Sequence, residues 1–175
     1  MDTFLFAFFL VLSCLCVNVA GRFVQYGEIF VVFNVYAPCD SSRQQALWNV
    51  LSSRIEALAD QNVCVCGDFN AIRCVEERRS VSSVFHQAGT DNFNGFIANI
   101  FLVDLPLQGR TYTWYRGDGR SMSRIDRFLL SENWCLTWSN CIRMAVSKGL
   151  SDHCPLVFAV DIQNWGPKPV RMLKC

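Results

Sequence analysis

The run Glu28–Tyr36 reads EIFVVFNVY, is stopped by Ala37-Pro38, and limits the possible folds more than any other segment of the chain. β-branched and aromatic residues in such a run predict a buried strand, and the Ala-Pro pair predicts that the strand ends in a turn. The apolar segment Cys14–Val24 precedes it, with only Gln25-Tyr26-Gly27 between them. The two segments together predict a β-hairpin. A buried hairpin needs other elements packed against it, which the rest of the chain has to supply.

Helices and strands alternate along the remainder of the chain. Residues 43–60 carry apolar side chains on one helical face, and Ser41 with Gln44 resembles a capping box at the start of this helix. A second helix is expected to begin at Thr90 or Asp91, because apolar residues follow at helical spacing. Strands are expected at Asn62–Cys66, Thr111–Tyr115, Arg124–Leu130, Cys141–Val146 and Leu156–Val160, with a short helix capped by Ser131. This mixture predicts a layered α/β domain, and two sheets with helices outside would fit it.

The composition indicates one globular domain. Of the 175 residues 51% are apolar and 18% are charged, which excludes a disordered chain. No repeat, low-complexity stretch or Pro/Gly/Ser linker divides the sequence. We assign residues 1–13 to a hydrophobic N-terminus that is either fortuitous or signal-like, residues 14–165 to the domain, and residues 166–175 to a tail.

The ten cysteines favour a reduced protein. No CxxC pair and no Cys/His spacing typical of zinc occurs among them. Cys14, Cys16, Cys64 and Cys66 alternate with apolar residues, as the inward positions of strands do. Because free cysteine packs as a small hydrophobe, we expect core thiols in an intracellular compartment, nuclear or cytoplasmic.

The N-terminus supports two interpretations. Phe4–Val17 is almost entirely apolar and Asn18-Val19-Ala20 resembles a cleavage site, as in a secretory signal, but Asp2 stands where a basic residue is usual. The run is shorter than the roughly 20 apolar residues of a transmembrane helix, so no stable membrane partner is expected. We favour a strand here, because cleavage near Ala20 would remove half of the hairpin. Secretion is the alternative.

Polar residues stand at the end of an apolar strand in four places, which is where α/β folds put ligand sites. The four blocks read NVYAP at 34–38, GDFNA at 67–71, SRIDR at 123–127 and SDHCP at 151–155. Each has another explanation when taken alone. Gly67–Asn70 has the composition of a turn, and Asp126 could form a salt bridge with Arg124 or Arg127. Carboxylates, an Asn and water would suit a hard cation such as Mg²⁺ or Mn²⁺.

In this order, the four blocks match the pattern NxYxP, GDFN, an Asp in R(I/L)DxxL, and SDH. The chain thereby resembles the endonuclease/exonuclease/phosphatase superfamily, which includes DNase I and the apurinic/apyrimidinic endonucleases. The residues of these blocks are most similar to those of the endonucleases of LINE-type non-LTR retrotransposons, especially those of plants. The resemblance covers residues 14–162 and implies a DNase I-like sandwich of two sheets flanked by helices. It also implies metal-dependent hydrolysis of DNA phosphodiesters.

The resemblance implies catalytic roles for five residues. Asp68 would orient or help activate the attacking water, and Asn70 would hold the scissile phosphate beside it. His153 would contact a non-bridging phosphate oxygen or serve as the base. Asp126 would pair with His153, fixing its orientation and favouring its charged form. Tyr36 would hydrogen-bond the phosphate.

Metal and DNA contacts are implied as well. Asp152 would lie near the metal, directly or through water, together with Asp68. Trp114 and the neighbouring Arg116 and Arg124 would lie near the DNA, where stacking and phosphate contacts are useful. Five of the thirteen arginines fall between positions 110 and 127, although the net charge is only +1. A solvated charged surface is the other explanation of that strip.

One part of the family pattern has no match in this sequence. Members carry an Asn on a first strand, and then a Glu, in a Gln-Glu context, as the principal metal ligand. No Gln-Glu pair precedes Glu28. We therefore expect a domain that lacks its N-terminal strands, with impaired catalysis, whose partners are DNA and other retroelement domains. The alternatives are a hydrolase of the same fold acting on a non-DNA phosphate, and an inactive secreted or membrane-associated domain.

Overall fold

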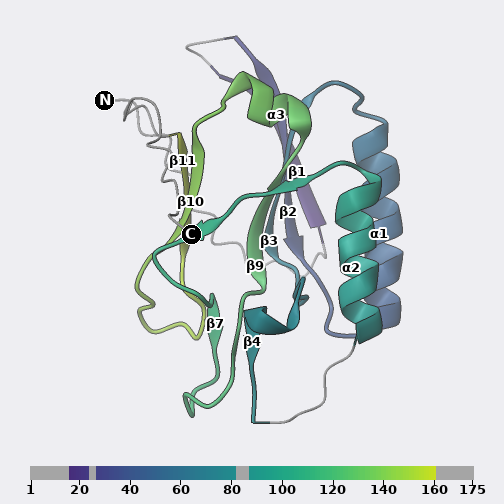
Figure 1. Ribbon diagram of the computed structural model, residues 1–175. Helices are drawn as coiled ribbons and strands as arrows, with labels where there is room; N and C mark the ends of the chain where they lie inside the picture. Colours follow the sequence, from purple (N-terminus) through teal and green to yellow (C-terminus); the bar gives the residue numbers. More distant parts are fainter. Residues whose placement is uncertain (1–15, 24–26, 82–86, 161–175) are drawn as a thin grey trace, which may run out of the picture.

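The computed structural model describes residues 16–160 except 24–26 and 82–86, so the N-terminal residues 1–13 and the tail 166–175 lie outside it. It contains two packed sheets, a pair of helices on the outside and a small third sheet at one end (Figure 1). The large sheet has the order β1 (Cys16–Arg22), β2 (Ile29–Tyr36), β3 (Asn62–Asp68), β9 (Asp126–Leu130) and β5 (Val103–Asp104).

Two three-stranded sheets accompany the large one. The second has the order β11 (Leu156–Val160), β10 (Cys141–Ala145) and β6 (Leu107–Gln108), and the third has β4 (Arg78–Arg79), β8 (Met122–Ser123) and β7 (Trp114–Tyr115). The helices are α1 (Ser41–Glu56), α2 (Gln87–Asn99) and α3 (Glu132–Thr137), with a 3₁₀ turn η1 at Val75–Glu77.

The predicted hairpin is present. β1 and β2 pair antiparallel from Cys16 opposite Val35 to Arg22 opposite Ile29. β2 then runs parallel to β3, with α1 as the crossover between them, and β9 lies antiparallel on the other side of β3. The carboxyl ends of β2 and β3 and the start of β9 therefore meet at one edge of the large sheet.

The helices α1 and α2 cover the outer face of the large sheet (Figure 1). Apolar side chains at helical spacing on α1 meet alternate side chains of the strands, because successive strand residues point to opposite faces. Trp48 is almost fully buried at the centre and stacks on Phe96 at 5.0 Å between ring centroids. This outer core comprises Val31, Phe33, Val35, Leu47, Trp48, Leu51, Ile55, Val63, Val65, Phe69, Phe93, Phe96, Ile97 and Leu129, among others.

A second core fills the space between the two larger sheets. It contains the opposite set of strand residues, including Cys64, Cys66 and Phe128, packed against Phe158 of β11. Cys64 and Cys66 are buried as predicted, and all eight cysteines that the structure describes are free thiols. Within the described ranges, no helix has the length and apolarity that a membrane span requires.

Two predicted helix starts are wrong. The N-cap of α1 is Asp40, whose carboxylate accepts the Arg43 amide at 2.9 Å, and Gln44 is buried in another role. In α2, Thr90 is buried within the helix rather than capping it. Gln44 and Thr90, two of the residues expected at these helix starts, are both buried. The strand expected at Thr111–Tyr115 is also shorter, because only its last two residues pair with β8.

Candidate active site

The strand register gathers three of the predicted site residues at one edge. Tyr36 at the end of β2 lies opposite Asp68 at the end of β3, and Asp68 lies opposite Asp126 at the start of β9. The Ala37 amide donates to the Asp68 carbonyl at 2.8 Å, which holds the ends of β2 and β3 together as the strands separate. The ends of three adjacent strands thus present a phenol and two carboxylates on one rim.

The loop after β3 has a backbone shape that its sequence requires. Gly67 has a φ of +125°, and a Cβ there would lie 2.1 Å from the Val35 carbonyl oxygen, so no other residue fits without a shift of backbone. Asn70 has a φ of +46°, its amide donates to Asp68 Oδ1 at 2.9 Å, and its side-chain Nδ2 donates to the Ala37 carbonyl at 2.8 Å. GDFN is therefore a turn that orients Asp68.

His153 reaches the same rim from the loop before β11. The Cys154 amide donates to the Thr113 carbonyl at 2.7 Å, and the Tyr115 amide donates to the Asp152 carbonyl at 2.9 Å. These bonds attach the SDH segment to β7, where Trp114 forms a bridge with His153. The small third sheet thus fixes where the histidine stands.

His153 and Asp126 form a close pair. The histidine Nδ1 lies 3.1 and 3.0 Å from the two carboxylate oxygens of Asp126, as the resemblance implied. The salt bridge that sequence reasoning left open for Asp126 is not formed among the described residues. Arg124 and Arg127 contact Glu77 instead. Asp126 and Arg127 point to opposite faces of β9, which is why neighbours in the chain have different partners.

Burial and neighbouring groups shift the pKa values of Asp68 and His153. Burial and, as the second cause, the negative charge of Asp126 raise the pKa of Asp68 to about 6. The hydrogen bond that Asp68 accepts from the Asn70 backbone amide opposes this rise. The hydrogen bond that His153 donates to the Asp126 carboxylate raises the pKa of His153, while burial opposes the rise. The site therefore carries excess negative charge near Asp68 and favours an imidazolium at His153.

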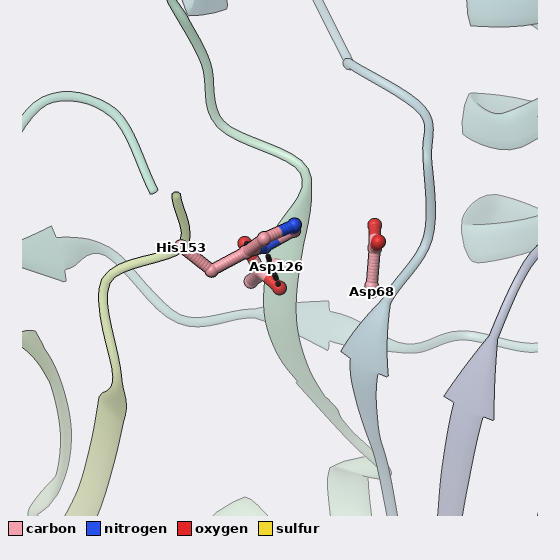
Figure 2. Close-up of side chains that lie close together, drawn as sticks. All are labelled: Asp68, Asp126 and His153. Atoms are coloured by element: carbon pink, nitrogen blue, oxygen red, sulfur yellow. Dashed lines mark hydrogen bonds and ion pairs between the residues drawn. The ribbon is translucent and has the colours of Figure 1, made fainter. Parts of the chain in front are cut away.

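Asp68, Asp126 and His153 form a group with the donors that a metal ion needs. One ligand atom from each lies within 4.8 Å of the others, and all three side chains are half-buried (Figure 2). Asp68 and Asp126 lie on neighbouring strands, and His153 leans over Asp126 from its own loop in Figure 2. The raised pKa of Asp68 fits a cation here, because a positive charge would relieve the repulsion between the carboxylates.

The other predicted residues surround this group at different degrees of exposure. Tyr36 is 59% exposed at the rim. Asp152 is exposed and is not part of the group of three, since its Oδ2 accepts the Trp114 indole N–H at 2.9 Å. Arg116 is exposed on the loop between β7 and β8 and pairs with Asp118 at 3.5 Å. Arg124 is half-buried, and its Nε donates to the Thr111 carbonyl at 2.9 Å.

Two supporting residues were missed by sequence reasoning. Thr113 is fully buried, and its hydroxyl accepts the amides of Ile125 and Asp126, both at 3.1 Å. Gln44 was predicted to belong to a helix cap. Its Nε2 instead donates to the Asn70 carbonyl at 3.0 Å. Thr113 fixes the backbone of Asp126, and Gln44 fixes the loop after Asp68. A buried polar residue at an inward position was the available signal for both.

Comparison with known proteins gives a matching family model and several solved structures of similar fold. The model of the "Endonuclease/Exonuclease/phosphatase family" matches residues 3–153. Among solved structures, the endonuclease domain of TRAS1, a telomere-specific non-LTR retrotransposon, is 15% identical with a TM-score of 0.64, covering 91% of this chain and 67% of that one. The AP endonuclease LMAP from Leishmania major is 15% identical with a TM-score of 0.63, covering 77% and 50%.

Beta toxin from Staphylococcus aureus is 12% identical with a TM-score of 0.57, covering 81% of this chain and 56% of its own. The chain thus spans about half to two thirds of the length of these three structures. The search of curated proteins gave no match. At such identities the likeness shows the fold alone, and it confirms the predicted DNase I-like α/β sandwich. With a family model matched over most of its length, the chain belongs to the endonuclease/exonuclease/phosphatase family.

Proposed function

We propose that this chain is a metal-dependent phosphodiesterase that cleaves DNA, of the kind found in non-LTR retrotransposons of the plant LINE type. Its family and its neighbours indicate hydrolysis of the nuclease or phosphodiesterase type. The observation that carries the proposal is the group formed by Asp68, Asp126 and His153 at one rim of the sandwich. The four ordered sequence blocks and the TRAS1 likeness support the retrotransposon assignment.

Phosphodiester hydrolysis needs an activated nucleophile and neutralisation of the developing charge. Asp68 would orient the attacking water and contribute to binding Mg²⁺ or Mn²⁺, with Asp152 assisting directly or through water. The cation, when bound, would neutralise charge on the phosphate. The Nδ1 of His153 is occupied by Asp126, so Nε2 is the nitrogen left for a non-bridging phosphate oxygen. The raised pKa of His153 favours a proton donor over a base in this role.

Further residues would position the substrate. Asn70 and Tyr36 would hold the scissile phosphate, since both stand on the rim next to Asp68. Trp114, Arg116 and Arg124 would meet the flanking DNA. Arg116 is the freest of these to reach a phosphate, because its side chain is 65% exposed.

Metal affinity is proposed to be weak and turnover slow. Mg²⁺ takes six oxygen ligands in a near-octahedral arrangement. The group in the described part of the chain offers two carboxylates and an imidazole, and the imidazole is already bonded to Asp126. Calorimetry is expected to give millimolar Mg²⁺ binding that disappears in Asp68→Ala.

The test is nicking of supercoiled plasmid with and without Mg²⁺, followed by single-turnover kinetics. Asp68→Ala and His153→Ala are each expected to slow nicking by roughly 10²- to 10⁴-fold, the usual contribution of an acid–base group. Asp60→Ala is the matched control, because Asp60 is an exposed carboxylate in the turn after α1. Nicking by a folded wild-type chain that survives chelation or the Asp68 change would contradict the mechanism. Turnover of phosphoinositides or sphingomyelin without nicking would contradict the DNA assignment.

We extend the proposal to location. A DNA substrate and free thiols both fit a reducing compartment, nuclear or cytoplasmic. Other retroelement domains would be the protein partners. Titration of thiols in denatured chain purified from cells without reductant is expected to give close to ten free groups. A much lower count would favour the secreted alternative.

A further inference from the structure

A cavity of about 460 Å³ lies near the start of β9, where Arg124 is one of its lining residues. Its walls come from the segment after β3, from α2, from the β5–β6 turn and from β10. It is lined by Arg73, Cys74, Glu77, Asn94, Asp104, Leu105, Pro106, Arg124 and Arg143. None of these except Arg124 belongs to the site already described.

The charges around the cavity do not balance. Asp104 binds three guanidinium groups, those of Arg73 at 3.3 Å, Arg127 at 2.6 Å and Arg143 at 2.9 Å. Glu77 binds Arg127 and, at 3.6 Å, Arg124. The buried cluster formed by Asp104, Glu77 and these arginines therefore contains four cations and two anions, an excess of two positive charges.

The two carboxylates accept several donors, whereas two buried guanidinium N–H groups, at Nε of Arg127 and Arg143, have no partner among the described residues. Glu77 also accepts the Arg73 backbone amide at 2.7 Å, so its Oε2 has two donors, and its Oε1 contacts both Arg127 and Arg124. Arg143 is 1% exposed, and its Nε has no hydrogen-bond partner among the described residues. Leaving a charged donor buried and unpaired is costly, and the missing partner has to be an acceptor.

Arg143 is crowded by like charge as well as buried. Burial, together with the charges of Arg127 and Arg124, lowers the pKa of Arg143 to about 10, although Asp104 opposes this shift. At neutral pH the group is still a cation. An anion in the cavity would reduce the repulsion among these guanidinium groups and would give the Arg143 Nε–H an acceptor.

Arg73 is prepared to bind such an anion. Its Nε donates to Asn94 Oδ1 at 2.9 Å, and the Asn94 amide donates back to the Arg73 carbonyl at 2.8 Å. The side chain is 37% exposed, so part of the guanidinium is open to solvent. Because Asn94 already orients this guanidinium, it loses little conformational entropy when it binds an anion.

We propose that this cavity is a second anion site, which binds a phosphate group between Arg73, Arg124 and Arg143. Arginine forks match the oxygens of phosphate, and three guanidiniums converge here. Arg124 lines the cavity and stands two residues before Asp126, so the cavity adjoins the candidate active site. The source that the proposed function supplies is a backbone phosphate of the bound strand, and on that point the inference rests on the proposed function. Inorganic phosphate is the other source.

The test is titration of the full chain with inorganic phosphate at constant ionic strength in chloride, with EDTA present. Arginine Nε–H resonances are followed by ¹⁵N NMR. Saturable shifts at Arg143 and Arg73 are expected. Arg73→Gln is expected to weaken phosphate binding roughly tenfold, the usual worth of one charge-assisted contact at a partly exposed site. Arg54→Gln is the matched control, because Arg54 is exposed on α1 and the charge change is identical.

Shifts that do not saturate, or equal weakening by Arg54→Gln, would overturn the proposal, since either outcome means nonspecific attraction. Arg143→Lys keeps the charge but loses the fork, and is expected to weaken binding while circular dichroism remains unchanged. A metal-free oligonucleotide that displaces phosphate from the same resonances identifies the strand as the source. Failure to displace it identifies free phosphate. Because EDTA excludes metal-dependent hydrolysis, this result stands or falls separately from plasmid nicking.

Discussion

Two neighbouring residues of β9 take part in networks of opposite character. Asp126 binds His153 on a half-buried rim. Beside it lies a second carboxylate, Asp68, whose pKa is raised. Arg127, on the other face, is fully buried and bonded to Glu77 and Asp104. The buried network contributes to holding the domain together, whereas the rim pair is left accessible and titratable. A single strand thus separates a structural ion cluster from a chemical one, and the two can be perturbed independently.

The largest effect is expected from breaking the buried network. Arg127→Met removes the bonds that Glu77 and Asp104 accept from this guanidinium, which lies 5.6 Å from the Phe93 ring centroid, and leaves Glu77 with Arg124, at 3.6 Å, as its remaining guanidinium partner. Removing one member of a buried ion pair costs about 3–5 kcal/mol, which is a large part of the stability of a small domain. Urea unfolding measures it. Arg116→Met, which changes an exposed arginine in the same way, should cost less than about 0.5 kcal/mol. Equal losses would remove the distinction between the two networks.

The rim is expected to respond in the opposite direction. Because the folded-state pKa of Asp68 is raised to about 6, ionisation of this group destabilises the fold as pH rises from about 4 to about 6. Asp68→Asn should therefore stabilise the chain by about 2–3 kcal/mol at pH 7 and leave stability unchanged near pH 3, where the carboxyl is protonated in both states. Unfolding at the two pH values measures this, with Asp60→Asn as control. Destabilisation at pH 7 would show that Asp68 is structural.

A smaller change is expected from Asp126→Asn. The His153 pKa should fall, because the largest cause of its rise is the hydrogen bond that His153 donates to the Asp126 carboxylate, and ¹H NMR titration of the imidazole measures this pKa directly. A raised folded-state pKa gives stability that is present below about pH 6.5 and is lost as pH rises through the folded value. That pH-dependent part should disappear in the variant, while stability at pH 8 changes by at most about 1 kcal/mol. An unchanged His153 titration would contradict the pairing.

The smallest effect is expected at the outer edge of the rim. Trp114→Phe removes the indole N–H that lowers the pKa of Asp152, so that pKa should rise. Stability should change by less than about 0.5 kcal/mol, because the contact is solvent-exposed. Carboxyl ¹³C NMR titration measures the first quantity and thermal unfolding the second. No movement of the Asp152 titration would mean that the contact is not maintained in solution.

The sequence predicted the rim better than the buried network, for a physical reason. Strand periodicity gives which residues end a strand, and the ends of adjacent strands necessarily meet, so Tyr36, Asp68 and Asp126 could be brought together in advance. The network depends on partners distant in the chain, such as Arg127 and Glu77, which lie 50 residues apart. Local pattern does not show which buried arginine meets which carboxylate.

The same limit explains the wrong helix starts. Gln44 has the chemistry of a cap, but the turn after β3 lies close enough to accept its amide, and a tertiary bond replaced the local one. Asp40 then caps α1. For Thr113, likewise, the sequence shows only one residue of an alternating strand. Its role depends on the position of β9, because its hydroxyl accepts the backbone amides of Ile125 and Asp126.

Cys74 allows the arginine-lined cavity to be labelled chemically. It is an exposed free thiol on the cavity wall, and the other exposed described thiol, Cys39, lies just before α1, distant from Cys74 in the sequence. Partial burial, followed by the Glu76 contact, raises the pKa of Cys74, so alkylating reagents should modify it more slowly than an ordinary surface thiol. Labelling at the two positions can therefore be compared within one molecule. A fluorophore at Cys74 would report whatever enters the cavity, and Cys39 would serve as the internal reference.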